Sequence, residues 1–242
     1  MTQNIYDNDE FFAGYRQLRR SEEGLAGAPE WPSLRAMLPN LNGRRVLDLG
    51  CGFGWFCRWA IEQAAASVVG IDVSEKMLTQ AEAASDSAIK FIRADMDTLH
   101  LEPGTFDLVY SSLALHYLKN IDLLMAEVAA ALVPGGHFVF SVEHPLFTAP
   151  REPAWSHASD GRKIWPLDSY LEEGPRTTNW FVPGVVKQHR TLATYLNLMI
   201  HNNLALTHAE EWGPSDAQIA TWPQLADERQ RPTFLLLSAK RT

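Results

Sequence analysis

A glycine-rich turn is the first feature of this chain that could support chemistry. The run Asp48-Leu49-Gly50-Cys51-Gly52-Phe53-Gly54 follows an apolar stretch and precedes a helical pattern. Glycines let the backbone turn sharply and approach a ligand without a Cβ in the way, and free N–H groups at a helix start point into the same space. The spacing is Gly-x-Gly-x-Gly, whereas dinucleotide enzymes usually carry Gly-x-Gly-x-x-Gly. The turn therefore predicts a nucleotide-type cofactor site and disfavours a nicotinamide dinucleotide.

Carboxylates end the next two strand-like runs. Asp72 closes Val69-Gly70-Ile71-Asp72, at the position, about 20 residues after the glycines, where an acid can accept hydrogen bonds from a ribose diol. Asp95 follows residues 89–93 and is placed to accept from an adenine amino group. Ligands of open α/β sheets bind outside the carboxyl ends of the strands. Three strand ends thus point to one adenosine-containing ligand; a turn that binds nothing and a solvated Asp95 are the alternatives.

Three titratable side chains follow the fourth and fifth expected strands, and all three are candidate catalytic residues. His116 has an ordinary pKa of about 6.5, which suits a base near neutral pH; a histidine satisfied at a helix start is the alternative. Glu143 and His144 are adjacent in the sequence. Neighbours on an extended chain face opposite ways, so one of the two is expected to face the site. Strand parity with the apolar residues of the fifth strand favours Glu143.

The elements that position these residues alternate between strand and helix. Strand-like runs before position 143 lie at 46–48, 67–71, 89–93, 106–111 and 137–142, and helical patterns lie at 55–66, 75–84 and 121–132. This alternation indicates a parallel sheet covered on both faces. Helical spacing around Tyr15 and again around Leu34 predicts two helices before the sheet. A helix at 191–202 and apolar runs at 204–207 and 234–238 complete the pattern.

Residues 143–189 depart from this pattern. They contain six prolines and three tryptophans, and prolines so dense interrupt regular structure. We expect a long irregular insertion that acts as a lid, with an ordinary surface loop packed by its tryptophans as the alternative. Together with Tyr195 and the Lys187-Gln188-His189-Arg190 stretch, the tryptophans would form an aromatic, partly cationic pocket. Such a pocket suits a planar or anionic small molecule.

Bulk composition limits the class of protein. The chain has 242 residues, 46% of them hydrophobic and 21% charged, as is ordinary for a single folded domain. Its net charge of −8 disfavours general binding of nucleic acids. The sequence shows neither a signal peptide nor an apolar run of the roughly 20 residues that span a membrane, so we expect a cytoplasmic protein. Cys51 and Cys57, the only cysteines, predict neither a disulfide nor a metal site.

In combination and order, the motifs resemble those of the class I S-adenosylmethionine-dependent methyltransferases, particularly the small-molecule group sometimes called type 11. The resemblance covers roughly residues 45–142 and rests on residues 46–54, 70–77, 94–96, 106–112 and 132–136. It implies an α/β fold, with a doubly wound, Rossmann-like sheet of seven mostly parallel strands whose last strand is antiparallel. One domain would comprise an N-terminal helical cap (1–40), a cofactor-binding core (45–142), a lid insertion (143–190) after the fifth strand, and a C-terminal helix and strands (191–242).

The resemblance also implies S-adenosylmethionine as cofactor, with S-adenosylhomocysteine as product. The glycines would line its methionine portion, Asp48 would support the amino group through solvent, and Asp72 would take the ribose hydroxyls. Val73 and Met77 would flank the adenine, and Asp95 with the backbone of Met96 would read its edge. The expected cofactor residues are Tyr15, Arg19, Asp48, Gly50, Cys51, Gly52, Gly54, Asp72, Val73, Met77, Asp95, Met96 and Ser111. Of these, Tyr15 and Arg19 resemble residues of N-terminal helices that close over the cofactor; two surface residues are the alternative.

The leading hypothesis is an enzyme that moves a methyl group to an O, N or C atom of a small-molecule acceptor by in-line displacement. A sulfonium methyl is already electrophilic, so the protein must mainly align the nucleophile and remove its proton where needed. The run Ser111-Ser112-Leu113-Ala114, which stands in place of Asn-Pro-Pro-Tyr, counts against the nucleic-acid amine methylases. A non-catalytic S-adenosylmethionine-binding protein and an NAD(P)-dependent oxidoreductase are the alternatives. The oligomeric state is left open, with a homodimer as one option.

Overall fold

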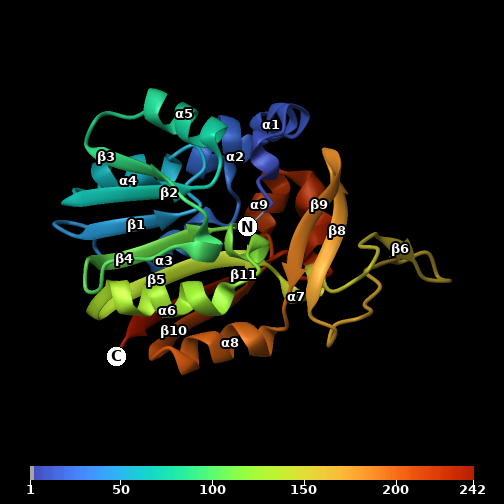
Figure 1. Cartoon of the computed structure of the whole chain (residues 1–242). Helices are drawn as coiled ribbons and strands as arrows, with labels where there is room; N and C mark the ends of the chain where they lie inside the picture. Colours follow the sequence, from blue (N-terminus) through green and yellow to red (C-terminus); the bar gives the residue numbers. More distant parts are fainter. Residues whose placement is uncertain (1–2) are drawn as a thin grey trace.

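A seven-stranded sheet forms the centre of the molecule, whose computed structural model describes residues 3–242. Its strands are β1 (Arg45–Leu49), β2 (Ser67–Asp72), β3 (Ile89–Arg93), β4 (Phe106–Ser112), β5 (Leu132–Glu143), β10 (Leu204–Trp212) and β11 (Phe234–Arg241). They lie in the order β10-β11-β5-β4-β1-β2-β3 (Figure 1). The strands from β1 to β5 pair in parallel, and β11 runs antiparallel to both of its neighbours. The predicted Rossmann-like sheet with an antiparallel last strand is confirmed.

Helices cover both faces of the sheet. They are α6 (Ile121–Ala131) and α8 (Leu192–His201) on one face, and α3 (Trp31–Met37), α4 (Trp55–Glu62) and α5 (Glu75–Ala83) on the other. Strand side chains alternate between the two apolar clusters, because successive residues of a strand point to opposite faces. Leu47 and Val109 pack toward α6 and α8, whereas Val46 and Leu108 pack toward α3 and α4. This two-sided burial explains why the strands read as continuous apolar runs.

Local capping fixes where the helices begin at the carboxyl edge of the sheet. Gly54 precedes α4 with φ of +71°, a left-handed conformation that glycine adopts without strain. Ser74 precedes α5 and accepts a hydrogen bond from the N–H of Met77 at 3.1 Å. Both helices therefore start within a few residues of the ends of β1 and β2, and their first turns lie at the same edge of the sheet.

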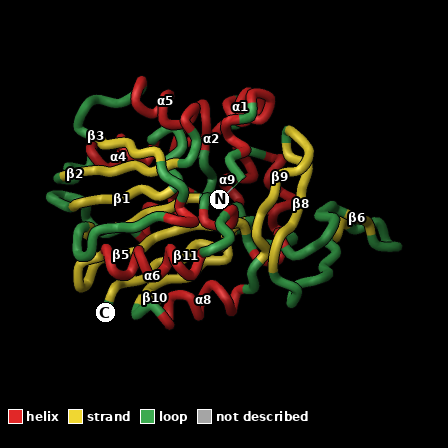
Figure 2. Tube along the Cα trace, viewed as in Figure 1, coloured by secondary structure: helices red, strands yellow, loops and turns green. Residues whose placement is uncertain are grey.

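Residues 143–189 are more regular than the sequence predicts. They include α7 (Pro145–Thr148), the short pair β6 (Ser156–His157) and β7 (Lys163–Ile164), and a β-hairpin of β8 (Gly174–Trp180) and β9 (Val182–His189). The prediction of irregular structure was wrong for the hairpin. Pro175 and Pro183 lie in a two-stranded ribbon, where each strand has an outer edge that needs no N–H donor. The chain between α7 and β8 is mostly loop and extends away from the sheet (Figure 2).

The remaining predicted elements are present, with shifted ends. α4 ends four residues before the predicted position 66, and Ala64 just beyond it takes φ of +63°. β10 and β11 are longer than the predicted runs at 204–207 and 234–238. The pattern predicts neither α9 (Asp216–Thr221) nor the 3-10 helix η5 (Pro223–Arg229), which lie between these strands. Within residues 3–242, no helix has the length and apolar character needed to cross a membrane.

The N-terminal elements cross the carboxyl edge of the sheet and meet the hairpin there. They are η1 (Ile5–Asp7), α1 (Asp9–Arg16), α2 (Arg19–Glu22) and η2 (Gly24–Gly27). Asp7 accepts hydrogen bonds from the Ser74 hydroxyl at 2.6 Å and from a backbone N–H of α5, which fixes this segment to the start of α5. Phe11 of α1 contacts Trp180 of the hairpin edge to face, with ring centroids 5.3 Å apart. The N-terminal segment and the hairpin thus cover the edge of the sheet together.

Candidate functional site

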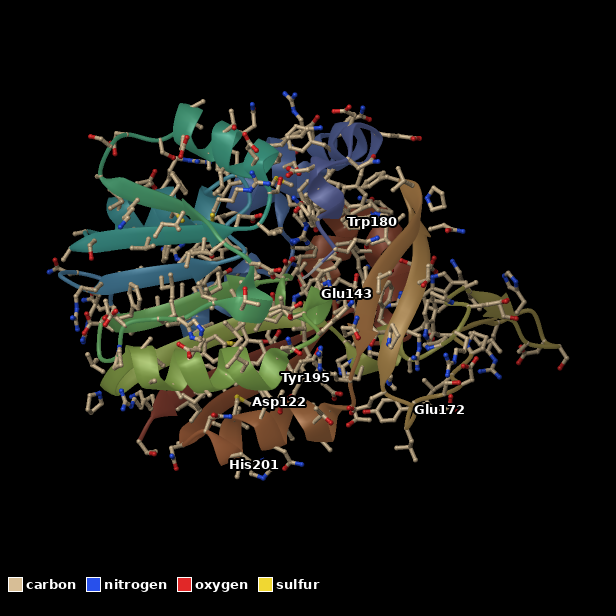
Figure 3. The ribbon with its side chains drawn as sticks, viewed as in Figure 1. Asp122, Glu143, Glu172, Trp180, Tyr195 and His201 are labelled. Atoms are coloured by element: carbon tan, nitrogen blue, oxygen red, sulfur yellow. The ribbon has the colours of Figure 1, made fainter. Side chains whose placement is uncertain are left out.

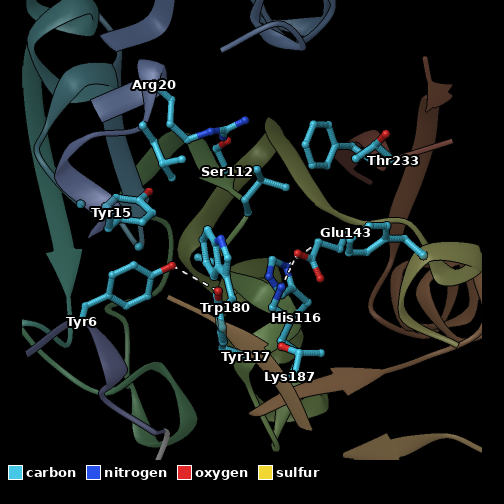
Figure 4. Close-up of a pocket in the computed structure, with 18 of the residues that line it drawn as sticks. Tyr6, Tyr15, Arg20, Ser112, His116, Tyr117, Glu143, Trp180, Lys187 and Thr233 are labelled. Atoms are coloured by element: carbon cyan, nitrogen blue, oxygen red, sulfur yellow. Dashed lines mark hydrogen bonds and ion pairs between the residues drawn. The ribbon is translucent and has the colours of Figure 1, made fainter. Parts of the chain in front are cut away.

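A cavity of about 620 Å³ lies at the covered edge of the sheet (Figure 4). Its walls come from the ends of β1, β2, β4 and β5, from the N-terminal segment, from the hairpin and from the connection before β11. One end, which we call the turn end, contains Gly50, Gly52 and Asp72. The other, which we call the aromatic end, contains Glu143, Trp180 and the residues around Trp165. Figure 3 shows Glu143 and Trp180 between the sheet and the hairpin, whereas Asp122 lies out on α6.

The glycine turn leaves room for a ligand beside its backbone. Gly50 has φ of +75°, and a Cβ there would lie 2.3 Å from the Cβ of Ala114. Its N–H and that of Cys51 donate to the carbonyl of Ile71 at 2.8 and 3.0 Å, which ties the turn to β2. Gly52 has φ of +52°, and a Cβ there would meet no atom within 4 Å. The turn is therefore fixed on the sheet side and open on the cavity side, as a backbone that contacts a cofactor requires.

Asp72 joins the turn to the start of α5. Its Oδ2 accepts from the N–H of Gly52 and its Oδ1 from the N–H of Ser74, both at 2.9 Å. Burial raises the pKa of this carboxyl, and the backbone hydrogen bonds oppose that rise. Each carboxylate oxygen has a further lone pair for a hydroxyl donor. A carboxylate on the cavity wall, with apolar Val73 and Met77 nearby in the sequence and also on the wall, fits the ribose and adenine of an adenosine ligand.

Some of the expected cofactor residues line the cavity, and the others do not. On the wall are Tyr15, Gly50, Gly52, Asp72, Val73, Met77 and Met96, and the others are Arg19, Asp48, Cys51, Gly54, Asp95 and Ser111. Asp48 is buried, accepts from the Cys57 thiol at 3.3 Å, and has its pKa raised to about 7 by burial. Ser111 donates to the carbonyl of Leu49 at 2.7 Å, and Asp95 accepts from the N–H of Asp97 at 3.0 Å. These groups support the turn and the adjoining strand ends.

Arg20, and not Arg19, lies on the cavity wall. Arg19 pairs with Glu23 at 3.0 Å and lies over the ring of Trp222. Arg20 makes two hydrogen bonds to the buried carboxylate of Glu30, at 3.0 and 3.2 Å. The spacing of Tyr15 and Arg19 assumes one continuous helix, but the helix ends at 16 and a new one begins at 19 after an extended Leu18. Because of this break, Arg20 and not Arg19 lines the cavity. Sequence periodicity gives no sign of the break.

At the aromatic end, Glu143 presents one paired and one unpaired carboxylate oxygen. Its Oε1 accepts from the Lys187 ammonium at 2.5 Å, and that ammonium lies 5.0 Å from the centroid of the Trp180 ring. Its Oε2 is buried and has no hydrogen-bond partner within residues 3–242. An unpaired buried carboxylate oxygen is costly, and Glu143 is one of the residues that line the cavity. The carboxylate can accept a proton or a hydrogen bond there.

His116 lies beside this carboxylate as a neutral ring (Figure 4). Its side chain is buried, and burial lowers its pKa to about 4. Its Nδ1 accepts from the backbone N–H of Glu143 at 3.4 Å, so the single proton of the neutral ring sits on Nε2. The ring is therefore a hydrogen-bond donor at neutral pH, in contrast to the base that its ordinary pKa suggests.

His144 lies outside the cavity. Its Nδ1 accepts from the N–H of Leu146 at 3.0 Å and so caps α7, and its Nε2 pairs with Glu211 at 2.9 Å. Glu143 and His144 thus face opposite ways, as adjacent residues on an extended chain are expected to do. Sequence reasoning missed several wall residues, namely Tyr6, Arg20, Tyr117, Glu228 and Arg231. The hydroxyls of Tyr6 and Tyr117 lie 3.2 Å apart, although 111 positions separate them.

The depressed pKa of His116 predicts a pH dependence of stability. Between the ordinary value of 6.5 and about 4, the unfolded chain binds a proton that the folded chain does not. The free energy of unfolding should therefore fall as the pH drops through this window, by up to roughly 3 kcal/mol from this group. Urea unfolding at pH 7 and pH 5 should show a smaller loss for His116→Gln than for the wild type. His100→Gln, at an exposed position, should lose as much as the wild type; the same loss in all three would contradict this account.

The chain matches known methyltransferases in sequence and in structure. A family model described as a methyltransferase domain matches residues 47–140. The crystal structure of an S-adenosylmethionine-dependent methyltransferase from Mesorhizobium loti is 57% identical and superposes with a TM-score of 0.87, covering 90% of this chain and 100% of that one. An uncharacterized protein of Haemophilus influenzae is 35% identical over 248 residues, which cover 98% of this chain and 97% of the relative.

A relative with a named acceptor matches a shorter stretch. The malonyl-[acyl-carrier protein] O-methyltransferase of Erwinia billingiae is 36% identical over 100 residues, which cover 41% of this chain and 39% of that protein. Because the match covers less than half of either chain, the acceptor of that enzyme is not transferred to this chain. The full-length match to the Mesorhizobium loti enzyme, together with the turn and the carboxylate described above, makes this chain a member of the S-adenosylmethionine-dependent methyltransferases, with S-adenosylmethionine as its cofactor.

Proposed function

We propose that this methyltransferase acts on a small molecule held at the aromatic end of the cavity, and that Glu143 accepts the proton of the acceptor. Two observations carry the proposal: Glu143 lines the same cavity as the glycine turn, and its buried Oε2 has no hydrogen-bond partner within residues 3–242. The N-terminal segment and the hairpin cover this cavity, which favours a molecule that fits inside it over a polynucleotide. The methylated atom is an O, N or C atom of the acceptor.

The turn end is assigned to the cofactor. The open side of the turn at Gly50 and Gly52 would hold the methionine portion, and Asp72 would accept from the ribose hydroxyls. Val73, Met77 and Met96 provide the apolar surface for the adenine. Arg20, fixed by Glu30, replaces Arg19 as the N-terminal cation that would pair with the cofactor carboxylate. When bound, the cofactor supplies an electrophilic methyl group on a positively charged sulfur.

The three sequence candidates receive different roles at the aromatic end. Glu143 accepts the acceptor's proton on Oε2, while Lys187 stabilises the carboxylate from the other oxygen. His116 donates from Nε2 and orients an acceptor oxygen or carbonyl, because its Nδ1 is engaged with the backbone. His144 takes no part in the reaction, since both of its ring nitrogens are occupied outside the cavity.

We assign the cover of the cavity to segments of the predicted cap and lid within residues 3–40 and 143–190; residues 1–2 of the predicted cap lie outside the described residues. α1 and the hairpin share an apolar cluster that contains Phe11, Val182 and Val185. A Cβ on Gly14 would lie 2.6 Å from the ring of Phe181, so the backbone of α1 is in direct contact with the hairpin. α1 and the hairpin are therefore assigned to one cover, whereas α3 packs against a face of the sheet.

Replacing Asp72 tests the cofactor assignment. Asp72→Ala removes the carboxylate that faces the cavity, and calorimetric titration should show S-adenosylhomocysteine binding weakened by about tenfold or more. Asp122→Ala removes an exposed carboxylate on α6 and should leave the affinity unchanged. An unaltered affinity in Asp72→Ala would reject the ribose assignment.

A pair of neighbouring arginines tests the N-terminal contact. Removing Arg20 alone would leave Glu30 buried without a partner, so the test variant combines Arg20→Gln with Glu30→Gln. We expect the dissociation constant for S-adenosylhomocysteine to rise about tenfold, because a charge-assisted pair with the carboxylate is lost. Glu30→Gln alone keeps the guanidinium and should lose less affinity than the double variant, and Arg19→Gln should bind as the wild type does. A loss in Arg19→Gln with full binding in the double variant would reverse the assignment.

Transfer of labelled methyl from S-adenosylmethionine into a metabolite extract tests both the acceptor class and the base. The label should appear in the small-molecule fraction, and Glu143→Ala should lower its rate of incorporation by about 10² while S-adenosylhomocysteine affinity is kept. His144→Ala should retain the wild-type rate, and His116→Ala should fall between the two. Equal rates in all three variants would mean that alignment alone drives the reaction. Label found only in a macromolecular fraction would reject a small-molecule acceptor.

A further inference from the structure

A cluster at the far end of the cavity is unused by the transfer chemistry. Arg231, only 6% exposed, lies against three aromatic rings, and its guanidinium carbon is 4.5 Å from the centroid of Phe147, 5.1 Å from Trp155 and 4.2 Å from Trp165. All four residues line the cavity, and we call them the aromatic chamber. The guanidinium thus contacts ring faces on several sides and is held in place by them.

The guanidinium of Arg231 has one paired nitrogen and one nitrogen without a partner among the described residues. Its Nη1 donates to Oε2 of Glu228 at 2.7 Å and to the hydroxyl of Thr233 at 3.3 Å. Its Nε is buried and has no hydrogen-bond partner in the part of the chain that the structure describes. A guanidinium carries five donors in a rigid fork whose geometry matches a carboxylate. Arg231 is thus a buried cation that lines the cavity and retains a donor that a ligand can use.

The aromatic rings do not form a cage for a cationic acceptor. Such cages hold a cation over open ring faces, but here Arg231 lies over the three rings of the chamber and Lys187 over Trp180. A quaternary or protonated amine would meet these like charges. A neutral or negatively charged acceptor avoids repulsion by these cations, and a negatively charged one gains a charge-assisted contact with Arg231.

We propose that the acceptor carries a carboxylate that binds to Arg231 in the aromatic chamber, apart from the atom that Glu143 prepares for methylation. The proposal rests on the proposed function, because it assumes that the acceptor occupies this end of the cavity. A carboxylate fits better than a phosphate for two reasons. It is planar, like the fork and the stacked rings of Phe147 and Trp165, which lie 5.6 Å apart at 9°. It also carries one charge, whereas a dianion would be repelled more strongly by Glu228.

Matched fragments test the charge of the acceptor. Benzoate, benzamide and phenyl phosphate share a ring and differ in their polar group, and each is titrated into the full-length protein saturated with S-adenosylhomocysteine. We expect benzoate to bind about tenfold more tightly than benzamide, because one fork contact to a carboxylate is gained. Benzoate should also bind more tightly than phenyl phosphate. Equal affinities for benzoate and benzamide, or no binding by either, would overturn the proposal, and a preference for phenyl phosphate would overturn the carboxylate.

Three variants assign the preference to Arg231. Arg231→Lys keeps the charge but loses the fork, so the preference for benzoate over benzamide should fall to about twofold. Glu228→Gln removes the competing carboxylate and should strengthen benzoate binding, an opposite effect that a merely damaged fold would not give. Arg162→Gln, at an exposed position, should leave the preference unchanged.

An undiminished preference in Arg231→Lys, or weaker benzoate binding in Glu228→Gln, would contradict the proposal. The affinity for S-adenosylhomocysteine is measured in every variant and should stay constant. Failure of the wild type to bind S-adenosylhomocysteine would count against the cofactor site of the proposed function and not against the aromatic chamber.

Discussion

One buried carboxylate organises the turn end of the cavity. Asp72 accepts hydrogen bonds from the turn at Gly52 and from the N–H of Ser74, and the hydroxyl of Ser74 in turn donates to Asp7 of the N-terminal segment. The chain of hydrogen bonds runs from the core of the sheet to its cover without a gap. Because burial raises the pKa of Asp72, these backbone donors are what keep its charged form favourable. The position of the cover therefore depends on the same group that faces the cavity.

The opposite end of the cavity is built from ion pairs set against aromatic rings. Two ion pairs, Lys187 with Glu143 and Arg231 with Glu228, each place a cation over aromatic rings. Each pair also has one polar atom without a partner in the described part of the chain. Aromatic faces stabilise these cations and keep water away from them, so the remaining electrostatic interactions are stronger than they would be in solvent. The two pairs come from segments far apart in the sequence. Only the return of β9 and of the connection before β11 to the edge of β5 brings them together.

The strands of the sheet and the glycine turn could be predicted from the sequence because each is encoded by a local pattern. Apolar runs buried on both faces identify the strands, and the spacing of Gly50, Gly52 and Gly54 after β1 identifies the turn. Sequence reasoning failed for the hairpin at 174–189, where proline density hid a ribbon with two free edges. It predicted Arg19 in the site because the prediction assumed one continuous helix, and helical spacing does not reveal the break at Leu18. It gave no sign of Arg231, which lies in a connection without periodicity and acquires its surroundings only through tertiary packing.

The close approach of α1 to the tip of the hairpin has a thermodynamic consequence. Phe181 rests on the backbone of Gly14, and Phe11 is enclosed by Trp180 and Val182, so separating the two halves of the cover exposes apolar surface on both. Any opening that separates them would be one cooperative event, with a single free energy that governs both the turn end and the aromatic end of the cavity. Any ligand that binds the closed state better than the open state shifts this shared equilibrium. By linkage, cofactor and acceptor that each prefer the closed state must raise each other's affinity by the same factor, without touching one another.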